Sequence, residues 1–214
     1  MAEREIEAKD YLEIGLALHG HKCPAMPMGL RVGAAAMNAL GVERARDGQL
    51  LAMVEIGVNH CATCFADGVQ VITGCTFGKG NITRLHYGKW ALTLVDRKSG
   101  RAVRVAVRAE MMAANKQTDF FQKYRMKGIP ASHVPPEAAE PLVERVLNAP
   151  EEQLLRIGEV FEHEAQDATH SFDSFVCASC GEMVAEPYGR LMGDKKVCIP
   201  CRREATGQLD GSRS

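Results

Sequence analysis

Apolar residues recur at helical spacing through the first forty residues of the chain. Residues 8–18 and 26–40 carry them every three or four positions, and Gly20 and Gly41 follow the two patterns. This spacing predicts two helices. Within the second helix, Gly29 and Gly33 lie four residues apart, and they either let another element pack closely or are simply tolerated there.

Shorter apolar runs come next. Residues 50–56 predict a buried strand, and residues 64–73 predict a short helix. Three further strand-like runs follow a glycine-rich turn, at residues 82–86, 90–96 and 102–107. The short loops between them predict an antiparallel meander. This order of elements favours an α+β domain, with helices packed on a mixed or antiparallel sheet, over a doubly wound sheet.

The rest of the chain predicts more helices and then a small separate domain. Helical patterns recur at residues 109–127, 137–147 and 151–165. The polar stretch that follows, residues 166–176, predicts a linker. We therefore expect a core domain over residues 1–170 and a small C-terminal domain over residues 171–214.

Composition and charge narrow the class of protein. The 214 residues are 46% hydrophobic and 25% charged, and the formal net charge is −1, so the chain as a whole shows no bias toward nucleic acid or anionic membrane. The charged start and the lack of any run of about 18 apolar residues predict neither a signal peptide nor a membrane span. We expect a cytoplasmic protein, in which eight cysteines favour metal or redox roles over disulfides.

Four of these cysteines form a pattern typical of a zinc ribbon. Cys177 and Cys180 make one CxxC pair, and Cys198 and Cys201 make a second. Four thiolates at this spacing suit one tetrahedral zinc, which would stabilise a segment too short to bury its own core. Iron is the competing metal. Nearby basic residues either contact an acidic protein or nucleic acid or form a solvated face, and we do not expect nucleic-acid binding; they are Arg190, Lys195, Lys196, Arg202 and Arg203.

The other four cysteines are spread through the larger domain. His19, His21 and Cys23 lie within five residues, and both imidazole and thiolate are good zinc ligands. The alternative is a helix end with surface histidines and a buried thiol. Cys61 and Cys64 form a further CxxC at a predicted helix start, which favours either metal binding or a thiol of lowered pKa.

Cys75 opens a glycine-rich turn, Cys75-Thr76-Phe77-Gly78-Lys79-Gly80-Asn81. The turn is not a phosphate-binding P-loop, because its glycine spacing is too short and Lys79 is followed by glycine. Its backbone amides and Lys79 suit an anion. A plain turn into the next strand is the alternative.

These motifs together resemble the FmdE family of formylmethanofuran dehydrogenase proteins. The resemblance rests on HGHKCP, the following MGLRVG, and CxxD-GVQ with TGCTFGKGN, over about residues 10–165. The segment at 175–203 is similar to the zinc finger of the DksA/TraR type. The resemblance implies an α+β core of the broad type seen in the catalytic domain of glyceraldehyde-3-phosphate dehydrogenase.

The resemblance also implies a metal site in the core, with zinc or another transition metal. The ligands that it implies are His21, Cys23, Cys64 and Cys75, with His19 as a possible substitute. Asp67 would orient a ligand, and Asp67 and Lys79 are the candidates for a catalytic role. Cys61 falls outside the family pattern and is an extra ligand, a resolving thiol or a buried residue.

Two functions follow as expectations. In the first, the chain is a metal-dependent enzyme or an accessory component of a molybdenum or tungsten oxidoreductase, and the core metal binds a small anionic or sulfur-containing ligand beside Lys79. In the second, both metals are structural and the chain binds a protein partner through its ribbon. We do not expect this chain alone to oxidise formylmethanofuran, and the resemblance implies a homodimer.

Overall fold

The computed structural model describes residues 5–58, 63–164 and 172–207. The chain divides into two compact units, residues 1–165 and 166–214, and each has its own hydrophobic core. None of the helices among the described residues is long and apolar enough to cross a membrane.

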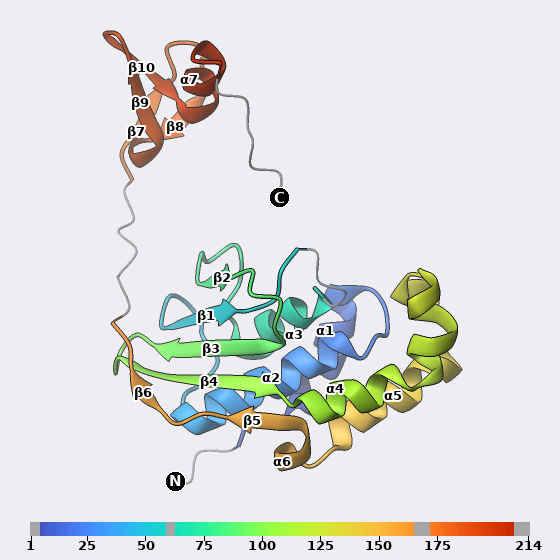
Figure 1. The fold of residues 1–214 in the computed structure, drawn as a ribbon. Coiled ribbons are helices and arrows are strands. Elements are labelled where there is room, and N and C mark those ends of the chain that lie inside the picture. Colours follow the sequence, from blue (N-terminus) through green and yellow to red (C-terminus); the bar gives the residue numbers. More distant parts are fainter. Residues whose placement is uncertain (1–4, 59–62, 165–171, 208–214) are drawn as a thin grey trace. The chain divides into compact units, whose positions relative to one another are not determined.

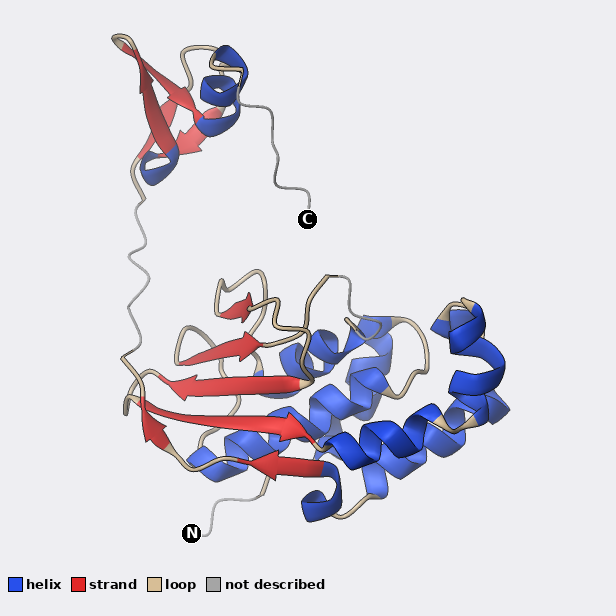
Figure 2. Cartoon of the chain, viewed as in Figure 1, coloured by secondary structure: helices blue, strands red, loops and turns tan. Residues whose placement is uncertain are grey.

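The first unit is built on a six-stranded mixed sheet (Figure 1). The strand order is β2-β1-β3-β4-β5, and β6 also pairs with β4. The strands are β1 (Leu50–Val54), β2 (Ile82–Arg84), β3 (Ala91–Asp96), β4 (Arg101–Val107), β5 (Leu155–Ile157) and β6 (Phe161–Glu162). Together with the helices on one of its faces (Figure 2), this sheet confirms the α+β fold class.

The predicted meander of three strands is wrong at its first strand. Strand β2 pairs in parallel with β1, and β1 lies between β2 and β3. The Leu85 amide donates to the Val54 carbonyl at 2.8 Å, and the Ala52 amide donates to the Asn81 carbonyl at 3.0 Å. An apolar run predicts a strand but not the neighbour with which it pairs, so the sequence could not reveal that β1 lies between β2 and β3.

Helix α2 is the centre of the core. It packs against α3 and α5 and covers strands β3 and β4, so its residues are buried almost throughout. Helices α2 and α3 lie side by side on one face of the sheet (Figure 1). The α-helices of the unit are α1 (Leu12–His19), α2 (Ala25–Leu40), α3 (Cys64–Thr73), α4 (Ala109–Lys116), α5 (Pro136–Asn148) and α6 (Glu151–Leu154).

The segment at 109–127 is helical as predicted but is not one regular helix. Helix α4 ends at Lys116, a π-helical turn spans Phe120–Tyr124, and a 3-10 turn spans Arg125–Lys127. Phe120 and Leu142 belong to a small apolar cluster that joins this segment to α5. We call residues 117–134 the arm.

The predicted helix at 151–165 is wrong beyond its first turn. Helix α6 ends at Leu154, and Leu155 pairs with Val107 as the first residue of β5. Phe161 then pairs with Ala102 in β6. The open edge of β4 offers backbone partners that outweigh the local helical preference, an effect that periodicity alone does not detect.

The second unit consists of two hairpins and a short helix. Its buried core is Cys177, Val197 and Cys198, a small set for a folded unit. The elements are β7 (Ser174–Val176), β8 (Met183–Ala185), β9 (Gly189–Met192), β10 (Lys195–Cys198) and α7 (Ile199–Ala205).

Candidate metal centre

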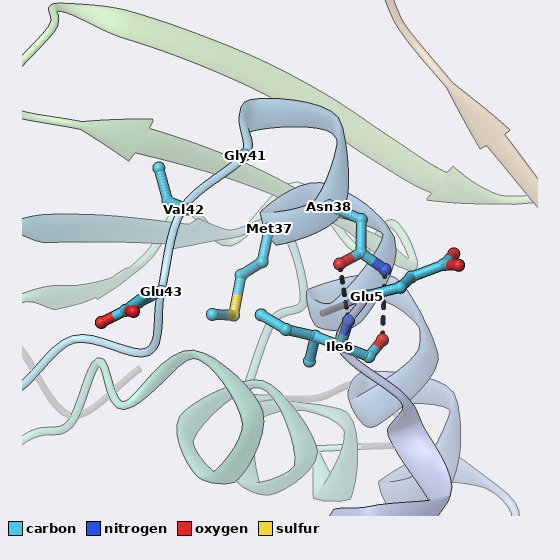
Figure 3. A pocket seen from close by; sticks show the side chains of 7 residues that line it. All are labelled: Glu5, Ile6, Met37, Asn38, Gly41, Val42 and Glu43. Atoms are coloured by element: carbon cyan, nitrogen blue, oxygen red, sulfur yellow. Dashed lines mark hydrogen bonds between the residues drawn. The ribbon is translucent and has the colours of Figure 1, made fainter. Parts of the chain in front are cut away.

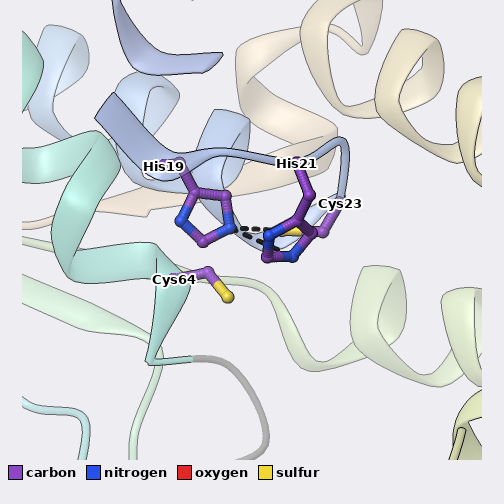
Figure 4. Close-up of side chains that lie close together, drawn as sticks. All are labelled: His19, His21, Cys23 and Cys64. Atoms are coloured by element: carbon purple, nitrogen blue, oxygen red, sulfur yellow. Dashed lines mark hydrogen bonds between the residues drawn. The ribbon is translucent and has the colours of Figure 1, made fainter. Parts of the chain in front are cut away.

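Three helix ends bring four predicted ligands of the first unit together (Figure 4). His19 is the last residue of α1, and Gly20 ends that helix with a φ of 85°, which turns the chain back. Cys23 lies just before α2, and Cys64 is the first residue of α3. With His21 from the turn, one ligand atom of each residue lies within 4.8 Å of the others. We call these four residues the core cluster.

The distances within the core cluster suit zinc. His19 Nε2 lies 3.2 Å from His21 Nε2 and 3.4 Å from Cys23 Sγ. Around a tetrahedral zinc with ordinary Zn–N and Zn–S bonds, two nitrogens are about 3.3 Å apart, and a nitrogen and a sulfur are about 3.5 Å apart. Two imidazoles and two thiolates also form a common zinc donor set.

Asp67 orients His19 from one helical turn beyond Cys64. Its Oδ2 accepts from His19 Nδ1 at 2.7 Å, which leaves His19 Nε2 facing the other ligands. The His19 side chain is only 7% exposed. A carboxylate that fixes the tautomer of a metal-binding histidine is a usual feature of zinc sites. This is the role that the family resemblance implies for Asp67.

The same contacts set the protonation of the metal-free core cluster. The hydrogen bond to Asp67 raises the pKa of His19 to about 9. A hydrogen bond from Cys64 lowers the pKa of Cys23 to about 7, and the Met26 and Ala25 amides act in the same direction. The pKa of Cys64 is raised, first by its bond to Cys23 and then by burial. Metal binding near neutral pH therefore releases protons, so metal affinity is expected to rise with pH.

Replacing Asp67 with asparagine is expected to weaken metal binding in the core cluster by about 10- to 100-fold, because the carboxylate that orients His19 becomes a neutral amide, which is a weaker acceptor. Competition with a chromophoric zinc chelator measures this affinity. Glu140→Gln is the matched control, since Glu140 pairs with Lys22 on the surface beside the same turn. Equal affinities for Asp67→Asn and the control would contradict the role of Asp67.

Cys75 and Lys79 lie away from the core cluster. Both follow the C-terminal end of α3, whereas Cys64 begins this ten-residue helix, which spans roughly 15 Å. The Cys75 thiol is fully buried, and burial raises its pKa to about 11. Lys79 Nζ donates to the Ala45 carbonyl at 3.1 Å. Cys61 lies outside the described residues.

Backbone amides of the glycine-rich turn already donate hydrogen bonds within the protein. The Thr76 amide donates to Asn81, the Phe77 amide to Gln70, and the Lys79 amide to Thr76. These contacts favour the plain turn over the anion site that the sequence left open.

The second unit gathers Cys177, Cys180, Cys198 and Cys201 into one cluster, again with ligand atoms within 4.8 Å of one another. The Cys198 amide points at Cys177 Sγ, and the Cys201 amide points at Cys198 Sγ. Gly181 closes the first knuckle with a φ of 77°. Amide-to-sulfur contacts of this kind stabilise thiolates, so the geometry suits a four-cysteine metal site.

A cavity of about 500 Å³ lies at the other end of α2 from the core cluster (Figure 3). Met37 and Val42 line it, together with Ile6. Asn38 holds the backbone of Ile6 through two hydrogen bonds, of 2.9 and 3.1 Å. This end of α2 carries none of the predicted ligands.

An α+β unit with two imidazoles and two thiolates, joined to a unit with four clustered cysteines, defines a two-domain metal-binding protein. The chain belongs to the FmdE family: residues 18–156 match the family described as FmdE, Molybdenum formylmethanofuran dehydrogenase operon. Residues 170–207 match the prokaryotic dksA/traR C4-type zinc finger. The family and the zinc finger predicted from the motifs are thereby confirmed.

Two similar proteins extend this comparison. A probable S-adenosyl-L-methionine-binding protein of Archaeoglobus fulgidus is 36% identical over 178 residues, which cover 77% of this chain and 46% of that protein. The chain thus spans about half the length of this relative. The crystal structure of a tungsten formylmethanofuran dehydrogenase FmdE-like protein from Syntrophus aciditrophicus has the same fold. Its TM-score is 0.62 at 23% identity, over 96% of this chain and 98% of that one.

Proposed function

We propose that the FmdE-like unit binds zinc through the core cluster and uses this site to bind a small anionic or sulfur-containing ligand. The observation that carries the proposal is the convergence of His19, His21, Cys23 and Cys64, with Asp67 behind His19. A bound zinc would supply a Lewis acid toward sulfur and oxygen atoms. With all four protein ligands in place, the small ligand would bind as a fifth neighbour or by displacing His21.

We propose that a ligand approaches the site from the turn between α1 and α2, because His21 lies in this turn and not on a helix. His21, His19 and Cys64 are all half-buried, and Cys23 is buried. Burial, the neighbouring His19 and the charge of Arg125 lower the pKa of His21, which marks Arg125 of the arm as a nearby positive charge. We propose Arg125, whose Nη1 also donates to the Ile129 carbonyl at 2.6 Å, as the partner for an anionic group in place of Lys79.

The name of the Archaeoglobus relative favours a sulfur-containing ligand. Because the similarity covers less than half of that protein, its ligand is a hypothesis for this chain. A thiol or thioether with a carboxylate would suit both features of the site, since such a sulfur matches zinc and a carboxylate matches an arginine. The sulfonium of S-adenosyl-L-methionine would leave only its amino and carboxylate groups for the metal.

Titration of the Co(II)-loaded protein with S-adenosyl-L-methionine and, separately, with mercaptoacetate tests this function. At least one of them is expected to change the Co(II) absorption and the emission of Trp90, the single tryptophan, which packs on Phe65 beside Cys64. Arg125→Gln is expected to weaken binding about tenfold. Lys127→Gln, an exposed change on the same 3-10 turn, is expected to have no effect. Unchanged spectra at millimolar concentrations of both compounds would contradict ligand binding.

The second candidate function is an accessory role in which the zinc finger binds a protein. The observation that favours it is an exposed apolar pair, Val176 and Met183, which face each other across the β7–β8 hairpin. Basic side chains are engaged within the finger, since Lys196 pairs with Glu186 and Arg202 donates to the Leu191 carbonyl. If Cys177→Ser with Cys180→Ser removes the finger metal but leaves all partner binding intact, this role is excluded. The homodimer stays a prediction.

A further inference from the structure

Helices α2 and α3 touch backbone to backbone at two glycines. A Cβ atom on Gly68 would lie 2.0 Å from the Met26 carbonyl oxygen, and one on Gly29 would lie 2.1 Å from the Phe65 carbonyl oxygen. Real Cβ atoms essentially never come within 3.0 Å of another heavy atom. The contact is reciprocal, because each helix presents a glycine to a carbonyl of the other. We call it the glycine contact.

The glycine contact lies beside both cysteines of the core cluster. Met26 is three residues beyond Cys23, and Phe65 directly follows Cys64. Gly68 also follows Asp67, which holds His19. The contact therefore begins within one turn of each cysteine, near the N-terminal ends of both helices.

The two helix ends have like partial charges. The N-terminus of a helix carries a partial positive charge, so two such ends side by side repel each other unless an anion lies between them. With a metal bound, the thiolates of Cys23 and Cys64 supply anions in this position. Backbone contact through the glycines holds the two ends at short range without the metal, and it involves no metal ligand.

We propose that Gly29 and Gly68 are positioning residues of the core metal site, because their contact fixes the separation of the Cys23 and Cys64 sulfur atoms before a metal binds. The inference rests on the proposed function, since it concerns the same site. A methyl group at position 68 must move Met26 and the new Cβ apart from 2.0 Å to at least 3.0 Å, a shift of 1.0 Å. Metal–ligand distances tolerate only about 0.2 Å, so a shift of that size is expected to disrupt the ligand set.

The test compares Gly68→Ala with Gly33→Ala. Gly33 faces α3 one turn further along α2, but its Cβ would meet a side-chain methyl of Ile72 at 2.2 Å and not a backbone carbonyl. Gly68→Ala is expected to lower metal affinity at the core cluster at least about 100-fold and to change the Co(II) absorption. Gly33→Ala is expected to lower the Tm while affinity stays within about threefold and the spectrum is unchanged. A wild-type spectrum and affinity for Gly68→Ala would overturn the inference.

A measurement on the Cys177→Ser with Cys198→Ser variant, in which the core cluster holds the remaining metal, covers the case in which Gly68→Ala does not fold. If the glycine contact sets the spacing, stripping the core metal from this variant leaves its far-UV circular dichroism and its Trp90 emission unchanged. A loss of helical signal on stripping would show that the metal sets the spacing, and would overturn the inference. The proposed function fails separately, if wild-type protein binds no metal at the core cluster at all.

Discussion

Replacing Cys64 with serine is expected to empty the core metal site while the fold and the finger stay intact. Serine has nearly the same size but is a poor zinc ligand, so the metal content should fall from about two zinc equivalents per chain to about one. The fold should survive because α3 is held to α2 through buried contacts such as those of Phe65 and Val69. Elemental analysis after gel filtration measures the metal, and circular dichroism measures the fold.

Cys75→Ser is the matched control for this experiment. Cys75 is a buried thiol of the same unit, and it lies at the other end of α3 from the core cluster. The variant is expected to keep about two zinc equivalents, even if burial of the new hydroxyl lowers the Tm. Loss of the core metal in both variants would restore the ligand set that the family resemblance implies. Retention of the metal in Cys64→Ser would contradict the site.

Removing the metal from the finger is expected to unfold this unit alone. Among the described residues of the finger, only Cys177, Val197 and Cys198 are buried, so we expect the metal to supply most of its stability. Structural zinc contributes about 10–16 kcal/mol of apparent binding free energy in comparable small units at neutral pH. The double variant Cys177→Ser with Cys198→Ser should therefore become sensitive to proteolysis between residues 172 and 207, while the first unit keeps its Tm.

Limited proteolysis with mass spectrometry locates the cleavage sites in the finger. Met183→Ala is the control, because Met183 is exposed on β8 and is not a metal ligand. This variant should resist proteolysis as the wild type does. A double cysteine variant that remains resistant would show that the finger folds without metal.

Local sequence signals predicted the elements around both metal centres. The periodic pattern over residues 26–40 predicted α2, and the glycine after residue 73 ended α3 as expected. Gly29 and Gly33 do allow a close approach, and the element that they face is α3. The two CxxC pairs predicted the finger because their ligands come from short, self-contained knuckles.

Elements that depend on distant partners could not be predicted in this way. Strand β2 lies at one edge of the sheet, beside β1. Residues 155–157 and 161–162 form the other edge, next to β4. Each of these pairings joins segments far apart in the chain. The hydrophobic pattern records which face is buried but carries no information on which strand lies alongside.

Only part of the core cluster could be predicted from the sequence. The HGHKCP segment pointed to His19, His21 and Cys23, because the three residues are neighbours in the sequence. Cys64 was a candidate through its CxxC pair with Cys61, and the family resemblance added Cys75 beside it. Motif order cannot tell which end of a helix faces a site. The structure separates these two cysteines along α3, and this is the physical reason that only Cys64 lies with the histidines.

X-ray absorption spectroscopy at the zinc edge tests the central claim most directly. The sample is the Cys177→Ser with Cys198→Ser variant, in which the core cluster holds the remaining zinc. We predict two sulfur neighbours at about 2.3 Å and two nitrogen neighbours at about 2.0–2.1 Å, from Cys23, Cys64, His19 and His21. A shell of three or four sulfur atoms, or a protein without bound zinc, would contradict the assignment.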